Sequence, residues 1–412
     1  MKLVVLPPTG IRATPEERRA KRPIGRDIES YQKTLADLEM LAEACDREDV
    51  TAFGVTEHHF HTEGNESIPN SLLWYAKLAA RTERLKYIPL SVVLPANDPI
   101  RVAENVAFFD NMFPDRLQGV CFARGYVTRW MQTLMQRERV GAGPIDLEAN
   151  ALNREIFNEY LDLILKAWTE DTINFNGKHY QAPYPATGIP HWPVASWTRE
   201  FGGEGEVDEN DVIHRVGLVP KPLKVPDIWM PYTHSYETLV QVAQKQYTTI
   251  IYDGQPDRFR KACVDYQTEA AKAGLNKKLG ESIAPLRKIY IGDTFEEAFE
   301  LAVATGGYWF NNYFSLWGIN EQSRIPSDPP DRMVTFADDR ACAQRMLEQG
   351  QMLCGTADDV SRQLESLQGV HGGDGEIEYL IWEYWVAPNT PRDQQLDQLD
   401  RFMNKVWPRF KA

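Results

Sequence analysis

Short apolar runs alternate with longer amphipathic stretches along most of the chain. Runs of about four to eight apolar residues bounded by polar or turn residues predict buried strands, and apolar residues at helical spacing predict helices that cover them. This alternation is typical of βα units around a parallel sheet. The eight candidate strands are Leu3–Leu6, Ala52–Thr56, Tyr87–Leu94, Leu117–Ala123, Ile228–Tyr232, Thr248–Tyr252, Leu286–Ile291 and Tyr379–Trp385.

Several of the intervening stretches carry helix-start signals. A capping carboxylate or hydroxyl followed by proline, or by an acidic residue three positions later, marks the first turn of a helix. Such signals are Asp98 before Pro99, Thr294 with Glu297, and Thr356 with Asp359. A further stretch, residues 153–168, has one apolar face. That face consists of Ile156, Tyr160, Leu163, Ile164 and Ala167.

Eight strands with intervening helices favour a closed (β/α)8 TIM barrel, with a doubly wound sheet as the alternative. We expect residues 1–412 to form one barrel domain, because such barrels exceed about 250 residues when their loops carry insertions. Three segments break the alternation and are interpreted as insertions, near 126–150, 181–225 and 305–340. The second is rich in proline and contains an acidic patch at 204–211, which favours a long excursion over the surface.

Composition narrows the classes of partner. A hydrophobic fraction of 43% and a charged fraction of 25% are ordinary for a water-soluble globular chain, and the net charge of -14 disfavours binding to nucleic acid. The first apolar run is too short for a signal peptide or a membrane span, so we expect a cytoplasmic protein with no membrane partner. The five cysteines form no CxxC pair, which fits a reducing compartment and argues against a zinc knuckle.

Polar residues at the C-terminal ends of barrel strands are candidates for chemistry. The sharpest cluster directly follows the strand AFGV and contains Glu57, His58, His59 and His61. Imidazoles transfer protons near neutral pH, and an adjacent carboxylate can fix their tautomer. A metal site is the alternative, but neighbouring positions of a strand point to opposite faces, so no metal is predicted. His59 could equally bond the loop backbone, and His61 is interpreted as structural or solvated.

A second cluster follows the strand LQGVC. Arg124 emerges there beside Gly125 and Tyr126. A guanidinium group suits a phosphate, and a surface salt bridge is the equal alternative.

A third cluster, Thr233 to Tyr236, follows the strand IWMP and leads into a helix pattern. Free backbone N–H groups and hydroxyls at such a helix start bind phosphate. An ordinary Ser235 N-cap is the commoner alternative.

The ordered series of these segments resembles the bacterial luciferase-like flavin monooxygenases. The resemblance is carried by EHHF, by PNSLLWYAKLAARTERLKYIPLSVVLPANDPIRVAENVAFFDNMFPDRLQGVCFARGY and by GTADDVSRQL. It covers residues 1–125 well and later segments more loosely, and it does not extend to the insertions. It implies a (β/α)8 barrel that binds FMN at its C-terminal mouth, and a homodimer. It also implies that a separate NAD(P)H-dependent flavin reductase supplies the FMN already reduced (FMNH2), and that a flavin peroxide forms with O2.

The resemblance also assigns roles to individual residues. Glu57 and His58 match the family's acidic residue and catalytic histidine, Arg124 matches the phosphate-binding arginine, and Ser235 with Tyr236 matches the helix start that receives the phosphate. The implied cofactor site further includes Leu90, Ser91, Gly125, Tyr126 and Thr233.

The family pattern implies one unusual peptide bond, and two positions of this chain depart from the pattern. Leu90 and Ser91 fall where the family often has a cis peptide that is not prolyl, beneath the flavin ring. Ala123 stands where luciferase has a cysteine, and Tyr232 where it has a glutamate, so light emission from an aldehyde is unsupported. No GxGxxG follows a candidate strand, which agrees with a two-component scheme.

We therefore expect His58 to move a proton at the flavin, with Glu57 orienting its ring, in a water-poor pocket. The second and third insertions are rich in aromatic residues, which predicts a small apolar or aromatic substrate, unless these rings serve packing or a dimer interface. The aromatic residues are Trp192, Trp197, Trp309, Phe310, Tyr313, Phe314 and Trp317. The substrate-binding candidates are His59, Trp309, Phe310 and Tyr313.

Three other functions stay open. A deazaflavin (F420)-dependent oxidoreductase would use the same barrel to transfer hydride, whereas a flavin-binding protein without catalysis would keep the phosphate site alone. A metal-dependent barrel hydrolase would use the histidines as ligands. Within the monooxygenase interpretation, the sequence leaves hydroxylation, Baeyer–Villiger oxidation and desulfonation undecided.

Overall fold

The computed structural model describes residues 1–141, 147–232 and 235–411. Eight parallel strands close into a barrel in the order β1-β2-β3-β4-β7-β8-β9-β11, and β11 pairs with β1 to complete the ring. The barrel prediction is thus confirmed, and the doubly wound alternative is wrong. The barrel strands are β1 (Lys2–Leu6), β2 (Ala52–Val55), β3 (Lys86–Val93), β4 (Val120–Ala123), β7 (Ile228–Tyr232), β8 (Thr248–Ile251), β9 (Ile283–Ile291) and β11 (Tyr379–Glu383).

Each of the eight predicted strands corresponds to a barrel strand. The fourth begins later than predicted, because Leu117 forms only an isolated bridge to Tyr87 and regular pairing starts at Val120. A strand that we did not predict, β10 (Met352–Gly355), pairs with the C-terminal half of β9. Its four residues stand directly before the capping signal at Thr356, so the apolar run is too short to be conspicuous.

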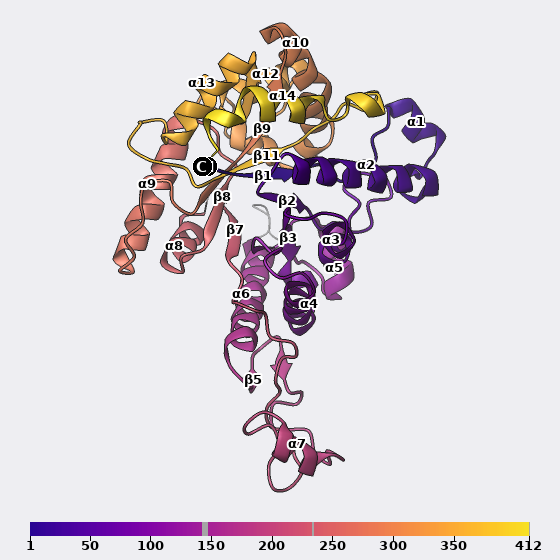
Figure 1. Cartoon of the computed structure of the whole chain (residues 1–412), viewed down its shortest axis with the longest axis vertical. Helices are drawn as coiled ribbons and strands as arrows, with labels where there is room; N and C mark the ends of the chain where they lie inside the picture. The colour runs from indigo at the N-terminus through magenta and orange to yellow at the C-terminus, as the bar shows by residue number, and fades with distance from the viewer. Residues whose placement is uncertain (142–146, 233–234, 412) are drawn as a thin grey trace.

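Helices cover the outside of the barrel (Figure 1). Those described are α1 (Pro15–Ala20), α2 (Ile28–Arg47), α3 (Ser71–Ala79), α4 (Pro99–Met112), α5 (Thr128–Met135), α6 (Leu147–Thr169), α7 (Ala195–Phe201), α8 (Tyr236–Gln244), α9 (Pro256–Lys272), α10 (Phe295–Ala302), α11 (Tyr308–Asn312), α12 (Asp339–Glu348), α13 (Ala357–Gln368) and α14 (Asp397–Lys405). None of them, within the part of the chain that the structure describes, is long and apolar enough to cross a membrane.

Most of the predicted helix starts are confirmed in detail. Asp98 caps α4 by accepting from the N–H of Arg101, and Thr356 caps α13 in a complete capping box. Thr294 caps α10, but the carboxylate of Glu297 accepts from the N–H of Asp293 at 2.8 Å instead of returning to Thr294. The box predicted there is therefore only half formed.

The barrel interior is filled by alternate residues of the strands, as the pleat of a strand requires. One buried apolar cluster contains an inward set from every barrel strand. It comprises Val4, Leu6, Ala52, Ile88, Leu90, Cys121, Trp229, Ile250, Ala284, Leu286, Tyr379 and Ile381. The outward residues pack against the covering helices in a second, larger cluster. The same alternation carried two residues further places Lys288 of β9 and Glu383 of β11 in the top layer at the C-terminal mouth.

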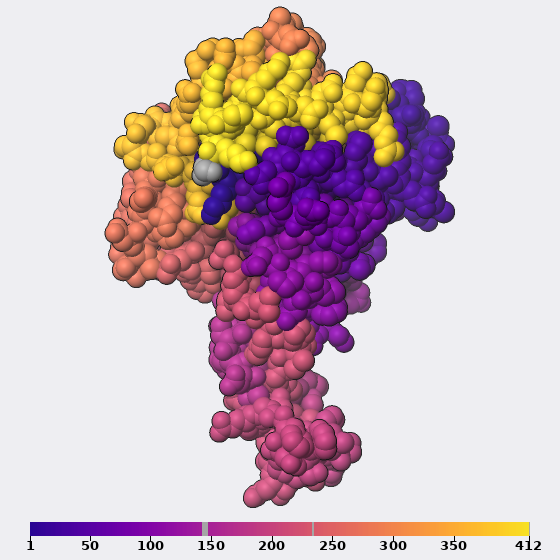
Figure 2. All heavy atoms as spheres, in the orientation of Figure 1, coloured from indigo at the N-terminus to yellow at the C-terminus, as the bar shows by residue number. Residues whose placement is uncertain are grey.

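The three insertions take different positions. The first contains α5, and its residues 142–146 lie outside the described residues. The second, with β6 (Gln181–Ala182) and α7, forms most of an arm that projects away from the barrel (Figures 1 and 2). At the base of that arm, β6 pairs antiparallel with β5 (Phe175–Asn176).

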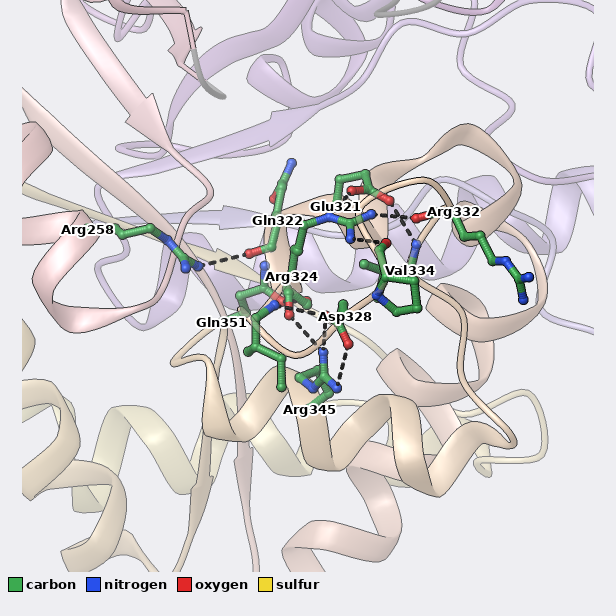
Figure 3. Close-up of polar contacts among 12 residues, drawn as sticks. Arg258, Glu321, Gln322, Arg324, Asp328, Arg332, Val334, Arg345 and Gln351 are labelled. Atoms are coloured by element: carbon green, nitrogen blue, oxygen red, sulfur yellow. Dashed lines mark hydrogen bonds and ion pairs between the residues drawn. The ribbon is translucent and has the colours of Figure 1, made fainter.

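The third insertion packs beside the mouth as a helical segment. It contains a π-helix at Val303–Gly307, α11 and short 3-10 turns at Phe314–Trp317 and Ile319–Ser323, and its apolar residues join a cluster with α10 and α12. Charged side chains hold it in place (Figure 3): Arg258 of α9 donates to the carbonyl of Gln322 at 3.3 Å, and Arg345 of α12 donates to Asp328 at 2.9 Å. The aromatic residues of this segment are thereby held near the barrel mouth.

Candidate active site

The loop after β2 brings the predicted carboxylate and imidazoles to the mouth. Glu57, His58 and His61 are buried, with 6%, 8% and 7% of their surface exposed. Each of the three histidines has a carboxylate or a tyrosine of its own. Among the described residues, no group of three or more His, Cys, Asp or Glu side chains is arranged to hold a metal ion.

Glu57 ties His59 to the end of β3. Its Oε1 lies 2.9 Å from His59 Nε2 and accepts from Asn97 Nδ2 at 2.9 Å, while its Oε2 accepts from the N–H of Val93 at 2.9 Å. The expectation that Glu57 orients His58 is therefore wrong. The carboxylate is directed toward β3, and the ring within its reach is that of His59.

His58 is paired with a residue that the sequence analysis missed. Its Nε2 lies 3.2 Å from Oε1 of Glu66, and its Nδ1 is buried without a hydrogen-bond partner in the described structure. Burial, followed by the nearby charges of His61 and His59, lowers the pKa of His58 to about 3. Burial and then the charge of Glu383 raise the pKa of Glu66 to about 8. Both shifts favour a neutral acid beside a neutral imidazole at neutral pH.

His61 links this loop to the third insertion. Its Nδ1 lies 2.9 Å from the hydroxyl of Tyr313, and its ring meets that of His58 edge-on at 5.3 Å between centroids. The solvated interpretation of His61 is wrong, because the loop turns it into the barrel mouth, where burial lowers its pKa to about 4. Trp130 of α5 packs against His58 and His59, so aromatic groups surround the imidazoles.

The predicted substrate-binding aromatics fall into two groups. Tyr313 contacts His61, and the ring of Phe310 lies 3.9 Å from Lys288 Nζ, so both reach the mouth. Trp309 packs between Arg18 and Trp385 instead. Trp192 and Trp197 are not part of the site, because they lie on the projecting arm, where Trp197 is 67% exposed.

A buried ion pair completes the mouth. Lys288 Nζ lies 2.6 Å from Oε2 of Glu383, and the two side chains are 4% and 15% exposed. Glu383 is close enough to Glu66 to raise the pKa of that acid. The signal that was available is a single lysine within the apolar run APLRKIYI and a single glutamate within YLIWEYW.

A second polar region lies at the ends of β4 and β7. Arg124 donates to Asn150 Oδ1 at 2.7 Å, and no carboxylate of the described chain pairs with it. Burial, and next the charge of Arg154, lower its pKa to about 10. None of the described carboxylates supplies the surface salt bridge considered for Arg124. Asn150 and Arg154, one turn apart on α6, were missed because the sequence does not show that α6 crosses behind β4.

The first N–H groups of α8 need hydrogen-bond partners. Ser235 is its N-cap and accepts from the N–H of Thr238 at 3.4 Å. The hydroxyl of Tyr236 donates to Glu269 of α9 at 2.8 Å, so that side chain is directed toward a neighbouring helix and offers only its backbone N–H to a ligand. Thr233 lies outside the described residues.

Two backbone features shape the space between these regions. The peptide between Leu90 and Ser91 is cis, as predicted from the resemblance. Gly125 has φ of +73°, and a Cβ there would lie 2.4 Å from Met131 Sδ and 2.5 Å from Val93 Cγ1. Glycine at 125 thus allows β4, β3 and α5 to approach closely. Tyr126 follows, with its ring edge-on to that of Trp317 at 5.8 Å.

Known proteins resemble this chain in sequence and in fold. The chain is 24% identical over 382 residues to 2,5-diketocamphane 1,2-monooxygenase 2 of Pseudomonas putida, covering 90% of this chain and 93% of that protein. The structure of the oxygenating constituent of 3,6-diketocamphane monooxygenase of Pseudomonas putida, a type II Baeyer–Villiger monooxygenase in complex with FMN, superposes with a TM-score of 0.68 at 19% identity. That superposition covers 93% of this chain and 95% of that one.

The same fold also serves another cofactor. An F420-dependent secondary alcohol dehydrogenase superposes with a TM-score of 0.60 at 11% identity, over all of this chain and 99% of that one, which is a likeness of fold alone. Family membership is decided by sequence: the family model of the luciferase-like monooxygenases matches residues 18–372, which include all the barrel strands except β1 and β11. The chain therefore belongs to the luciferase-like monooxygenase family.

Proposed function

We propose that this chain is an FMN-dependent monooxygenase that oxygenates a small, largely apolar organic substrate with O2. A separate NAD(P)H-dependent flavin reductase would supply the reduced FMN, and the enzyme would act as a cytoplasmic homodimer. The observation that carries the proposal is Arg124, a partly buried guanidinium without a carboxylate partner in the described chain, close to Arg154. A partly desolvated cation of this kind is stabilised by an anion, and a phosphate group supplies one.

The residues present fit FMN. Arg124, Arg154 and the N–H groups at the start of α8 would hold the phosphate. The ring would lie between the cis peptide at Leu90 and the loop after β2. Two buried ring nitrogens on that loop, His58 Nδ1 and His61 Nε2, have no hydrogen-bond partner in the described structure, as expected of groups that meet a polar ligand.

When bound, reduced FMN supplies two electrons to O2, so that one oxygen atom enters the substrate and the other leaves as water. His58 and Glu66 would carry out the proton transfer. A neutral Glu66 carboxyl donates to Nε2, and this fixes the ring proton of His58 on Nδ1. A proton given up from Nδ1 is then replaced through Nε2 from Glu66, without any buried charge before the transfer.

Aromatic side chains would keep water out. Trp130 covers the imidazoles on one side, and Tyr313 and Phe310 of the third insertion cover the mouth on another. Exclusion of water strengthens the hydrogen bonds inside the site and suppresses release of hydrogen peroxide.

The proposal is tested by anaerobic titration of the purified protein with reduced FMN, reduced riboflavin and reduced F420. We expect FMN to bind more tightly than riboflavin, because only FMN carries the phosphate, and F420 to bind weakly. R124M should weaken FMN binding by about 10- to 100-fold, the value of a charge-assisted hydrogen bond, and leave riboflavin unaffected. K166M serves as the matched control, since Lys166 is exposed on α6 and pairs with Asp162.

The complex of the protein with reduced FMN is then mixed with oxygenated buffer, and oxidation of the FMN is followed. Preference for F420, or equal binding of FMN and riboflavin by the wild type, would contradict the proposal and favour hydride transfer or simple flavin binding.

A further inference from the structure

The top layer of the barrel interior is charged where the layers below it are apolar. Ala284 and Leu286 of β9 and Ile381 of β11 belong to the buried apolar core of the barrel. The next inward positions are Lys288 and Glu383, whose register follows from the pairing of Leu286 with Ile381. Burial of two charges in a barrel interior is costly, and an apolar pair of similar volume would serve packing at least as well. This cost points to a use beyond packing.

The contacts of Lys288 leave it able to donate further. An ammonium group carries three N–H donors. One side of Nζ faces Glu383 Oε2 at 2.6 Å, and another faces the ring of Phe310 at 3.9 Å from its centroid. Neither the carboxylate nor the ring uses all three hydrogens. The ammonium is 4% exposed, so a remaining hydrogen has little access to bulk water.

The groups around this ammonium select against other ligand classes. The carboxylate of Glu383 would repel an anionic ligand, while Lys288 would repel a cationic one. Tyr252, which directly follows β8, lies near both Glu383 and Glu66. The group as a whole therefore offers hydrogen-bond donors to a neutral ligand that bears an oxygen acceptor, and the surrounding rings suit an apolar body.

We propose that Lys288 donates a hydrogen bond to the carbonyl oxygen of the substrate, and that the substrates of this enzyme are neutral ketones rather than hydrocarbons or carboxylates. This inference rests on the proposed monooxygenase function and adds to it the class of substrate. Glu383 is a positioning residue, because it holds the ammonium in the top layer, and Phe310 of the third insertion closes over it. A site built to donate to a carbonyl discriminates strongly against an analogue that lacks one, because the buried donor is then left unpaired.

The test uses the protein loaded with oxidised FMN, so that no turnover occurs. The probes are the bicyclic ketone camphor, carrying carbon-13 at its carbonyl, and camphane, the hydrocarbon of the same shape. Binding is followed by the change in FMN absorption, and the carbonyl stretching band by infrared difference spectroscopy. We expect camphor to bind at least about tenfold more tightly than camphane, and its carbonyl band to shift to lower frequency on binding.

The main variant is the double substitution K288M with E383Q, which removes both charges together and leaves no unpaired buried ion. It should bring the camphor-to-camphane affinity ratio close to one and abolish the shift of the carbonyl band. E383Q alone keeps the ammonium and should retain the shift, and K166M should behave as the wild type. An unchanged ratio and band in the double variant would overturn the proposal and leave the ion pair as an anchor for Phe310.

Two further readouts keep the result decisive. Circular dichroism shows whether the double variant folds. If it does not fold, the carbonyl stretching band of camphor bound to the wild type is the test, because an unshifted band overturns the proposal. FMN binding is titrated separately. A wild type that does not bind FMN contradicts the proposed function, and the ketone preference is then measured without FMN by tryptophan fluorescence.

Discussion

Glu66 and His58 lie 3.2 Å apart, Oε1 to Nε2, inside the barrel mouth. Glu66 has φ of +52°, a left-handed conformation that is uncommon for a residue with a side chain and costs conformational energy. The loop therefore holds the carboxyl against the imidazole at the expense of local strain. The pair, rather than Glu57, is the unit from which the proton chemistry of this site is best understood.

The raised pKa of Glu66 makes stability depend on pH. The pKa is about 8 in the folded chain against an ordinary value of 4.5, so the stability that the neutral acid contributes is complete below about pH 4.5 and is lost as pH rises through 8. E66Q keeps a neutral side chain at every pH. We expect urea unfolding to give similar free energies for wild type and E66Q at about pH 4.5, and a more stable E66Q at about pH 9. A difference that does not change with pH would contradict the assigned shift.

Proton delivery should distinguish Glu66 from Glu57. H58A is expected to leave oxidation of reduced FMN intact but to lower the yield of oxygenated product by at least about tenfold, with hydrogen peroxide released instead. E66Q should follow it, because an amide can hold the ring of His58 but cannot replace its proton. E57Q should affect His59 and the end of β3, and so change FMN affinity more than coupling. The measurement is the ratio of product to hydrogen peroxide at saturating FMN, and uncoupling by E57Q alone would reverse the assignment.

The difference between these residues also shows what sequence could and could not establish. Strands, helix caps and the cis peptide at Leu90 depend on local signals or on the family resemblance, and these predictions were confirmed. The partner of an imidazole depends on the path of the loop, which turns at Phe60 with φ of +59° and brings Glu66 back to His58. The alternation of apolar and polar residues does not show that Glu66 lies beside His58.

Contacts between strands that are distant in the sequence could not be predicted from the sequence either. Lys288 and Glu383 are 95 positions apart, the difference of their residue numbers, and meet only because β9 and β11 are adjacent in the closed barrel. Glu383 looks like an isolated charge in an apolar run, and Lys288 looks like one half of an Arg-Lys pair in another. Arg124 illustrates the same point, since its neutral partner Asn150 lies on α6, whose position relative to β4 follows from packing.

Gly125 offers a test of the close packing at the mouth. Alanine at 125 would combine a left-handed backbone with a Cβ only 2.4 Å from Met131 Sδ, whereas Gly373 has nearly the same φ, +74°, and nothing within 4 Å of its Cβ position. G373A therefore measures the backbone cost alone, about 1 to 2 kcal/mol. We expect G125A to lower the free energy of unfolding by a further 1 to 3 kcal/mol, approximately the cost of overpacking. Equal destabilisation of the two variants in urea would show that Met131 and Val93 yield without cost.

The hydrogen bond between Tyr313 and His61 links the third insertion directly to the loop after β2, and its loss should loosen the cover of the mouth. Y313F keeps the ring but removes the hydroxyl that lies 2.9 Å from His61 Nδ1. The bond is worth about 1 kcal/mol, and its removal leaves a buried nitrogen unpaired. Y308F is the matched control, because Tyr308 begins helix α11, of which Tyr313 is the C-cap, and its hydroxyl makes no hydrogen bond to the described part of the chain.

If the third insertion excludes water, Y313F should raise the fraction of FMN oxidised to hydrogen peroxide while leaving the affinity for FMN unchanged, since the phosphate region around Arg124 is separate from the bond that is lost. Y308F should leave both quantities as in the wild type. An increase in FMN dissociation constant with unchanged coupling would place Tyr313 in cofactor binding rather than in the cover. Amide hydrogen exchange over residues 305–323 then provides the independent measure: faster exchange in Y313F than in Y308F is expected where the insertion detaches from His61.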